Sequence, residues 1–271
     1  MSLAVRDLFS VAGKVALITG GSRGIGEMIA AGFLAGGTKV YISSRKADAC
    51  EAAAARLVAA HGGECIALPA DLSKVEGVAA LAAAFTAREP RLDILVNNAG
   101  ASWGAKLGEF PEAGWDKVMD TNVKGPFFLT QALLPQLRAA AAAGTPSRVI
   151  NIGSVDGRGT PMFDTFSYGP SKAAIHHLTK MLAARLVRER ILVNAIAPGP
   201  FPTWMLSTGV GFGGKTEGDG VDWEKVGKMN PSGRVGTPED IAGLALFLAS
   251  RAGEYVVGEV IACDGGLLAA R

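Results

Sequence analysis

Residues that can exchange a proton and hold a carbonyl oxygen lie in the middle of the chain. Tyr168 and Lys172 stand four positions apart in the stretch SYGPSK, and Ser154 precedes them at the end of an apolar run. Positions four apart share one face of a helix, so the phenol and the ammonium would point the same way. A neighbouring ammonium favours the phenolate, and we therefore expect the pKa of Tyr168 to lie below the usual value of about 10. Such a tyrosine can give a proton to a ketone oxygen or take one from an alcohol, while a serine hydroxyl holds that oxygen.

A glycine-rich turn, TGGSRGIG, follows the first apolar run of the chain. Glycines let a turn pass close to a ligand, and the start of the following helix attracts a pyrophosphate through its free N–H groups and its dipole. A plain strand-to-helix turn would also use glycines, but the position after the first strand favours a dinucleotide. The residues of this turn that we expect to contact a nucleotide are Gly20, Ser22, Arg23, Gly24, Ile25 and Gly26.

The end of the second apolar run, VYISSRK, indicates which nucleotide would bind. A carboxylate there would bond the adenosine ribose and repel a 2′-phosphate, but this run offers Ser44 and Arg45, with no acid until Asp48. Arg23 could reach the same place, and two guanidinium groups bind a phosphate dianion well. Both arginines could also be solvated surface residues. We expect NADP(H) rather than NAD(H).

Each catalytic candidate also has an ordinary structural interpretation. A tyrosine and a lysine on one helix are commonly a buried ring and an amine that reaches solvent, and a serine after a strand is commonly a turn residue. Asn122, in a helix-like run, could mark a local bend. Only the joint occurrence of these residues with the glycine-rich turn favours catalysis.

No metal site is expected. His176 and His177 are adjacent, so they do not share a helix face, and no acid or cysteine joins them at ligand spacing; we expect surface or interface histidines. Cys50, Cys65 and Cys263 are scattered and form neither a disulfide framework nor a CxxC pair.

Seven short apolar runs alternate with longer Ala-rich helical patterns. The runs show almost no polar alternation, as is typical of strands covered on both faces. This order predicts a parallel sheet with helices on both faces, in a single α/β domain over residues 1–271. A glycine-rich stretch at 203–230 is long for a loop and indicates a lid or a disordered segment. The predicted strands are Lys14–Thr19, Lys39–Ser43, Glu64–Pro69, Asp93–Asn97, Arg148–Ile152, Ile191–Ile196 and Val260–Asp264, and the clearest helices are Asp48–His61 and Val75–Arg88.

Charge and hydropathy exclude several classes of protein. The 27 basic and 25 acidic residues nearly balance, and no basic run forms a nucleic-acid stripe. No apolar stretch approaches the roughly 20 residues that cross a membrane, and the first residues do not form a signal peptide. We expect a soluble, cytoplasmic protein with no nucleic-acid partner and no membrane span.

Taken in chain order, the motifs resemble those of the short-chain dehydrogenase/reductase family from Gly13 to Leu268. TGGSRGIG resembles the family's glycine-rich turn, NNAG its motif after the fourth strand, and SYGPSK its catalytic segment. Within the family, NNAGASWGA, VINIGSVDG and SYGPSKAA most resemble the 3-oxoacyl-[acyl-carrier-protein] reductases, including the branch of the rhamnolipid pathway. The resemblance implies a doubly wound Rossmann-type fold with seven parallel strands in the order 3-2-1-4-5-6-7.

The resemblance also implies roles for particular residues. It implies a catalytic tetrad of Asn122, Ser154, Tyr168 and Lys172, in which Asn122 positions a water that relays protons. Tyr168 and Lys172 would also contact the nucleotide, Lys172 at the nicotinamide ribose. The other implied nucleotide contacts are Asp71, Leu72, Asn98, Ala99, Gly100, Pro198, Gly199 and Thr203.

An assembly is implied as well. The family commonly forms homotetramers through its long helices, here Trp115–Ala143 and Ser167–Arg190, and through its last strand, here Val257–Leu268. Exposed sheet edges tend to be paired or covered, which fits this expectation.

We therefore expect an NADPH-dependent carbonyl reductase of fatty acid metabolism that reduces a 3-oxoacyl thioester, with Tyr168 as the proton donor. The acyl group could be carried on a small molecule or on a carrier protein. One alternative is a dehydrogenase of a sugar, a polyol or a steroid alcohol, and another is a non-catalytic NADP-sensing scaffold, against which the intact tetrad argues. Five residues could either wall an apolar substrate pocket or pack a long loop: Trp103, Trp204, Met205, Leu206 and Phe212.

Overall fold

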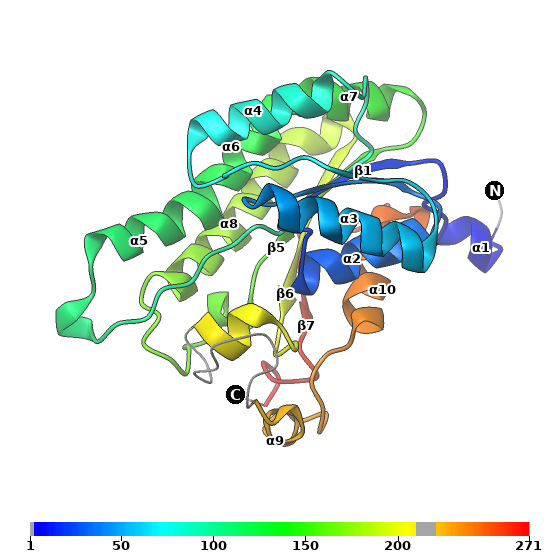
Figure 1. Cartoon of the computed structure of the whole chain (residues 1–271). Helices are drawn as coiled ribbons and strands as arrows, with labels where there is room; N and C mark the ends of the chain where they lie inside the picture. Colours follow the sequence, from blue (N-terminus) through cyan, green and yellow to red (C-terminus); the bar gives the residue numbers. More distant parts are fainter. Residues whose placement is uncertain (1–2, 210–220, 271) are drawn as a thin grey trace.

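The computed structural model describes residues 3–209 and 221–270 of the chain. Its strands are β1 (Val15–Thr19), β2 (Lys39–Ser43), β3 (Cys65–Ala67), β4 (Ile94–Asn97), β5 (Ser147–Ile152), β6 (Ile191–Pro198) and β7 (Val260–Cys263). All seven are parallel and form one sheet in the order β3-β2-β1-β4-β5-β6-β7 (Figure 1). The predicted fold, a doubly wound Rossmann-type sheet in this order, is confirmed.

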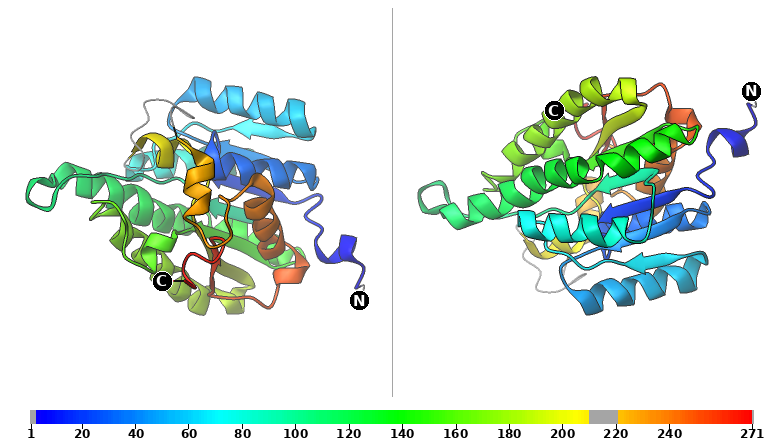
Figure 2. Two further views of the ribbon diagram at one scale, coloured as in Figure 1. Left: turned by 90° about the horizontal axis from the view of Figure 1, so that it is seen from below. Right: turned by 90° about the horizontal axis from the view of Figure 1, so that it is seen from above.

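Helices cover both faces of this sheet (Figures 1 and 2). One face carries α2 (Gly24–Ala35), α3 (Ala47–His61) and α10 (Pro238–Ala249). The other carries α4 (Val75–Thr86), α6 (Gly125–Ala132), α7 (Leu134–Ala142) and α8 (Tyr168–Leu186). The remaining α-helices of the described residues are α1 (Val5–Leu8), α5 (Glu112–Met119) and α9 (Trp223–Lys228). Across the described ranges, every helix falls short of the length and hydrophobicity that spanning a bilayer requires.

Successive strand residues point into two different cores. On β1, Ala16 and Ile18 belong to the core beneath α2, α3 and α10, whereas Val15 and Leu17 belong to the core beneath α4, α6 and α7. Every residue of the strand is buried. A parallel sheet with helices on both faces has no solvated side, which is why the apolar runs lack polar alternation.

Buried polar side chains join the two central strands to their helices. Asn97 Nδ2 donates to Asn151 Oδ1 at 2.9 Å and to Thr130 Oγ1 at 3.2 Å, and Asn151 Nδ2 donates to Thr179 Oγ1 at 2.9 Å. These bonds connect β4 and β5 with α6 and α8. Because unpaired polar groups in a core cost free energy, the network fixes how α6 and α8 sit on the sheet.

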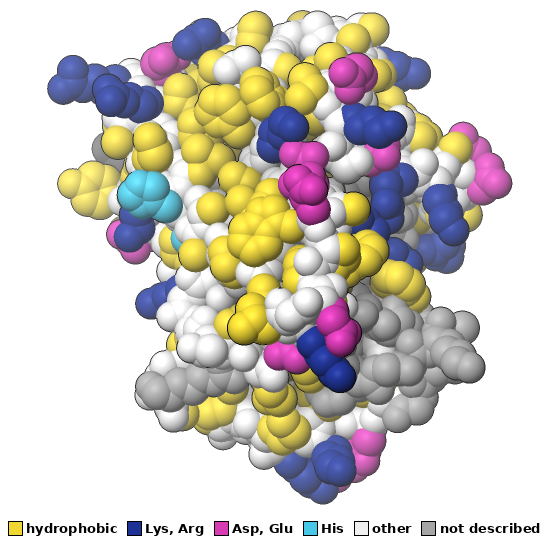
Figure 3. All heavy atoms as spheres, turned by 90° about the vertical axis from the view of Figure 1, so that its left-hand side faces the viewer, with side chains coloured by type: hydrophobic (Ala, Val, Ile, Leu, Met, Phe, Trp, Pro, Cys, Tyr) yellow, Lys and Arg dark blue, Asp and Glu magenta, His cyan; other side chains and the backbone are white. Residues whose placement is uncertain are grey.

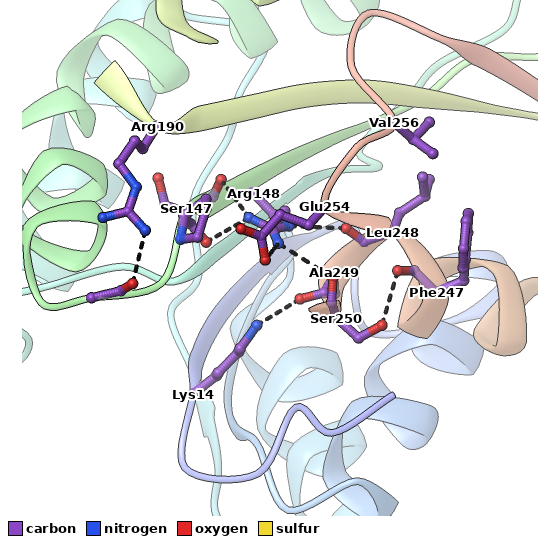
Figure 4. Close-up of polar contacts among 12 residues, drawn as sticks. Lys14, Ser147, Arg148, Arg190, Phe247, Leu248, Ala249, Ser250, Glu254 and Val256 are labelled. Carbon is purple, nitrogen blue, oxygen red and sulfur yellow. Dashed lines mark hydrogen bonds and ion pairs between the residues drawn. The ribbon is translucent and has the colours of Figure 1, made fainter. Parts of the chain in front are cut away.

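At the amino end of the sheet, two cations hold the last turn of α10 (Figure 4). Arg148 on β5 is only 2% exposed, and its guanidinium donates to the carbonyls of Leu248 and Ser250, both at 3.2 Å. Lys14 Nζ donates to the carbonyl of Ala249 at 2.6 Å. The last carbonyls of a helix lack intrahelical partners and carry the negative end of its dipole, so two cations stabilise this terminus.

Candidate active site

The glycine-rich turn is tied to the segment that follows β4. The Oγ1 of Thr19 accepts hydrogen bonds from the backbone N–H groups of Asn98 at 3.0 Å and Ala99 at 2.9 Å. The side-chain Nδ2 of Asn98 donates back to the carbonyls of Thr19 at 2.9 Å and Gly20 at 3.1 Å. The two segments are held together at the carboxyl edge of neighbouring strands, where α/β sheets bind their ligands.

The turn is shaped so that only glycine fits at two of its positions. A Cβ on Gly20 would lie 2.8 Å from Asn98 Nδ2, and the φ of 65° there is in the left-handed region. A Cβ on Gly26 would lie 2.3 Å from the carbonyl oxygen of Gly20. Helix α2 begins at Gly24, so its first N–H groups and its positive dipole end face the turn. This arrangement fits the pyrophosphate of a dinucleotide.

The end of β2 adjoins this turn, because the N–H of Gly21 donates to the carbonyl of Ser43 at 3.1 Å. Ser44, which is half-buried, and Arg45, which is exposed, follow directly. Arg23 is also exposed and lies two residues beyond Gly21. The structure thus places the backbone positions of both expected phosphate-binding arginines near the same corner of the sheet.

Asp71 lies near Arg45. Burial raises the pKa of the Asp71 carboxyl, but hydrogen bonds from Ser73 and the charges of Arg45 and Lys74 outweigh burial and hold the pKa below its usual value. Leu72, beside Asp71, is buried. The pair therefore forms part of the wall beside the end of β2.

Asn122 lies in a π-helical turn, Asp120–Lys124, that joins α5 to α6. Its Oδ1 accepts from the N–H of Ala101 at 2.7 Å, and its Nδ2 donates to the carbonyl of Ala101 and to Ser171 Oγ, both at 2.9 Å. The side chain is a well-bonded link between the segment after β4 and helix α8. Asn122 therefore does more than mark a local bend, and the π turn explains why an asparagine lies within a helical run.

Ser154, Tyr168 and Lys172 come together where β5 meets α8. Ser154 caps a short 3₁₀ helix, Val155–Gly157, with its Oγ accepting from the N–H of Asp156 at 3.1 Å. Tyr168 is the first residue of α8 and hydrogen-bonds with Ser154. Lys172 Nζ lies 5.5 Å from the centre of the tyrosine ring. A phenol and a serine hydroxyl in contact can hold a carbonyl oxygen and give it a proton.

The expected direction of the Tyr168 pKa shift was wrong. Burial of the phenol and the negative charge of Asp156 raise the pKa of Tyr168 to about 12, and the hydrogen bond with Ser154 only partly opposes them. Lys172 does not reverse this shift, because its own pKa is about 8 and it is already neutral at the pH where the phenol would ionise. Helical spacing correctly put the two side chains on one face, but it could not reveal the burial that decides the sign.

Lys172 is itself perturbed by its surroundings. It is 4% exposed, and burial lowers its pKa to about 8. The Cβ position of Gly100 lies 3.8 Å from Lys172 Nζ and 3.5 Å from Asn122 Oδ1, so the two polar groups face one small space beside Gly100. That space is suited to a bridging water.

The sequence did not reveal the position of His176, which we expected at a surface or interface. The side chain is buried beneath Ser154, and its Nε2 accepts from the Ser154 N–H at 3.4 Å. Burial and the charges of Lys172 and Arg158 lower its pKa to about 4, which keeps the imidazole neutral. A Cβ on Gly153 would lie 2.0 Å from this Nε2, so the glycine beside Ser154 was a signal of the close contact. His177 is exposed, as expected.

The remaining sequence candidates lie at the rim of the same edge. Trp103 packs against α5, since a Cβ on Gly114 would lie 2.7 Å from its indole, and the packing interpretation fits it best. Pro198 ends β6, and the N–H of Gly199 donates to the carbonyl of Cys263 at 3.0 Å.

The predicted loop at 203–230 is described only in part. Thr203 is followed by a π-helical turn, Met205–Gly209, which contains Leu206, and α9 lies near the end of the loop. Phe212 and the rest of 210–220 lie outside the described residues.

A doubly wound sheet with a glycine-rich turn and a serine, tyrosine and lysine at its carboxyl edge is the arrangement of an oxidoreductase that uses a dinucleotide. A family model described as "Enoyl-(Acyl carrier protein) reductase" matches residues 20–268. The chain belongs to the short-chain dehydrogenase/reductase family, as its motifs indicated.

Individual relatives are similar over nearly the whole chain. The "Rhamnolipids biosynthesis 3-oxoacyl-[acyl-carrier-protein] reductase" of Pseudomonas aeruginosa is 51% identical, over 95% of this chain and 97% of its own. A solved structure described as the "Pseudomonas aeruginosa RhlG/NADP active-site complex" has a TM-score of 0.88 at 49% identity, over 97% of this chain and 99% of that one. The "2-dehydro-3-deoxy-D-gluconate 5-dehydrogenase" of Dickeya dadantii is 36% identical, over 98% and 99% of the two chains.

Because the ammonium of Lys172 is buried, we expect this residue of the expected catalytic tetrad to lower the stability of the protein. Between pH 8 and 10.5 the unfolded chain holds a proton on Lys172 that the folded protein has lost, so the free energy of unfolding rises with pH there and the cost is fully present below pH 8. Each pH unit is worth about 1.4 kcal/mol, and the lost hydrogen bond to Ile152 costs about 1 kcal/mol. We expect Lys172→Met to raise the free energy of unfolding of the ligand-free protein at pH 7 by about 2 kcal/mol.

Denaturant unfolding of both proteins from pH 7 to pH 10 measures this effect. The advantage of Lys172→Met should shrink as pH rises above 8. Lys180→Met, an exposed lysine on the same helix, should change stability little at any of these pH values. A Lys172→Met protein that is less stable than the wild type at pH 7 would contradict the assignment of a costly buried charge.

Proposed function

We propose that this protein reduces the keto group of a 3-oxoacyl thioester to a secondary alcohol with NADPH. The observation that carries the proposal is the contact of Tyr168 with Ser154 beside Lys172, at the same sheet edge as the glycine-rich turn. Bound NADPH supplies the hydride to the carbonyl carbon. The protein has to hold the carbonyl, place it and protonate its oxygen.

In this proposal Tyr168 donates the proton and Ser154 holds the carbonyl oxygen. The raised pKa, about 12, keeps the phenol protonated through neutral pH, which is the form that reduction requires. The Ser154 hydroxyl stabilises the charge that develops on oxygen. The same raised pKa makes Tyr168 a poor base at neutral pH, so it supports reduction over alcohol oxidation.

Lys172 and Asn122 would return a proton to Tyr168. The pKa of Lys172, about 8, lets it give up and regain a proton near neutral pH. The space beside Gly100, between Lys172 Nζ and Asn122 Oδ1, suits the water of such a relay, because Oδ1 has a second lone pair beyond the bond to Ala101. We also assign Lys172 to the nicotinamide ribose.

NADP is proposed as the cofactor because of the corner at the end of β2. Arg23 and Arg45 supply two guanidinium groups there, and no carboxylate follows β2 directly. A 2′-phosphate would therefore meet two positive charges, which outnumber the Asp71 carboxylate near Arg45. The solved relative described as an NADP complex supports the same choice.

The substrate class is proposed from the similar proteins and from an apolar hollow. The 51% identical relative is described as a 3-oxoacyl reductase, whereas the sugar-acid dehydrogenase is 36% identical. A hollow of about 330 Å³ lies between the start of α5 and Phe166, two residues before α8, and it is lined by Leu107, Phe110, Pro111, Glu112, Trp115 and Phe166. An alkyl chain can fill such a lining, but the hydroxyls of a polyol would lose hydrogen bonds in it.

Steady-state assays with NADPH test this function. We expect turnover of 3-oxoacyl thioesters, with kcat/KM higher for long acyl chains than for short ones, and negligible turnover of sugars and polyols at matched concentrations. Presenting the same acyl group on CoA and on acyl carrier protein identifies the carrier. Polyol oxidation without thioester reduction would overturn the substrate assignment.

Replacing the proposed proton donor gives a second test. Tyr168→Phe removes one oxygen atom at the start of α8 and should lower kcat about 10²-fold to 10⁴-fold, because proton transfer to the carbonyl oxygen is lost. The affinity for NADPH should change much less. If hydride transfer proceeds at the wild-type rate in Tyr168→Phe, another group donates the proton.

We further propose that the chain acts as one domain and assembles as a homotetramer. Hydrophobic side chains are spread among charges on the face shown in Figure 3, at the α5 end of the molecule. Trp115 on α5 and Met181 on α8 are 42% and 56% exposed, which supports contact with another subunit. Light scattering should give four times the mass of the chain, and Met181→Lys should shift the protein to smaller species. A monomeric wild type would refute the assembly.

A further inference from the structure

One aromatic side chain reaches the nucleotide corner from a distant part of the sequence. The guanidinium of Arg23 lies 4.1 Å from the centre of the Trp204 ring. Beside this contact, Thr203 Cγ2 lies 3.2 Å from the Cβ position of Gly24. The segment that follows β6 therefore lies against the glycine-rich turn at two neighbouring points.

Stacking of this kind orients a guanidinium without consuming its hydrogen bonds. The attraction acts through the face of the planar group, whereas its N–H donors lie in the plane and point outward. An exposed arginine side chain has many rotamers, and fixing them costs free energy when a ligand binds. A ring against one face would reduce that cost.

The stacked guanidinium belongs to a turn whose backbone adjoins the end of β2, the corner where we expect a 2′-phosphate to bind. Gly21, two residues before Arg23, bonds the carbonyl of Ser43, and Ser44 and Arg45 follow it. Trp204 is distant from this corner in the sequence. It follows β6, which lies on the other side of β4 in the sheet. It lies in the segment that leads into the π-helical turn Met205–Gly209.

We propose that Trp204 is a positioning residue for NADP selectivity: it holds Arg23 ready for the 2′-phosphate by stacking on the guanidinium. This inference rests on the proposed use of NADP. By reciprocity, a phosphate that fixes Arg23 also holds Trp204, so the segment after β6 becomes more firmly held against the glycine-rich turn when NADP rather than NAD binds. Selectivity for NADP over NAD is thereby coupled to how firmly the segment after β6 is held against the glycine-rich turn.

Binding of nucleotide fragments tests the proposal without catalysis. Adenosine 2′,5′-bisphosphate and AMP differ only in the 2′-phosphate, and calorimetry gives the ratio of their affinities. We expect Trp204→Leu to reduce this ratio about threefold to fivefold while leaving the affinity for AMP nearly unchanged. Trp204→Phe, which keeps an aromatic face, should recover most of the ratio. The bisphosphate should also change the fluorescence of Trp204 more than AMP does, measured as the difference from Trp204→Phe.

Two further variants separate stacking from general packing. Tyr255→Leu removes an exposed aromatic ring between α10 and β7, away from this corner, and should leave the ratio unaltered. In an Arg23→Met background, Trp204→Leu should no longer affect the ratio, because the group on which it acts is gone.

The possible failures are distinguishable. If the wild-type protein binds both fragments equally, the proposed use of NADP is wrong. If it discriminates but Trp204→Leu keeps the full ratio, or weakens both fragments equally, the role of Trp204 is wrong. An effect that persists in the Arg23→Met background would also overturn it.

Discussion

The ammonium of Lys172 is buried, and its need for a hydrogen-bond acceptor constrains the packing at the carboxyl edge of the sheet. A buried charge needs an acceptor, and the carbonyl of Ile152 provides one at 2.8 Å. Helix α8 must therefore run close to the end of β5. A Cβ on Gly153 would lie 2.0 Å from His176, and one on Gly157 would lie 2.6 Å from the backbone of Lys172, so glycine is needed at both positions. The same close approach brings the first residue of α8, Tyr168, to the serine that follows β5.

Hydrogen bonds connect this corner to the glycine-rich turn as one continuous structure. Asn98 clamps the turn to the segment after β4, and Asn122 clamps the next part of that segment to Ser171 on α8. Two asparagine side chains thus join β1, β4 and α8, which come from widely separated parts of the chain. A site held by bonded side chains on strands and helices keeps its geometry better than one on free loops. The glycine-rich turn and the corner of Ser154 and Tyr168 are therefore fixed relative to each other by bonds within the protein.

The sequence predicted the fold, and which side chains of the site lie together, better than it predicted how deeply those side chains are buried. Unbroken apolar runs revealed strands buried on both faces, and the resemblance of the motifs to the family implied the strand order. Helical spacing placed Tyr168 and Lys172 together, yet the sign of the Tyr168 pKa shift depends on burial, which spacing does not encode. Likewise the burial of His176 follows from α8 packing against β5, and only the flanking glycines hinted at it. The stacking of Trp204 on Arg23 joins the segments after β6 and β1, which are three places apart in the sheet, and left no local pattern in the sequence.

Because a π-helical turn, Asp120–Lys124, joins α5 to α6, the number of residues between these helices affects the site. A π turn accommodates one residue more than a regular turn. Deleting one residue there would let the two helices merge into a regular α-helix, and the flanking side chains would keep about the same directions, because the extra residue is taken up within the π turn. The apolar residues of α6 would stay in the core, but the local backbone that directs Asn122 to Ala101 and Ser171 would be lost. Alignments that place a gap at this turn would therefore mark proteins in which this amide link has changed even where the helices and the other motifs are intact.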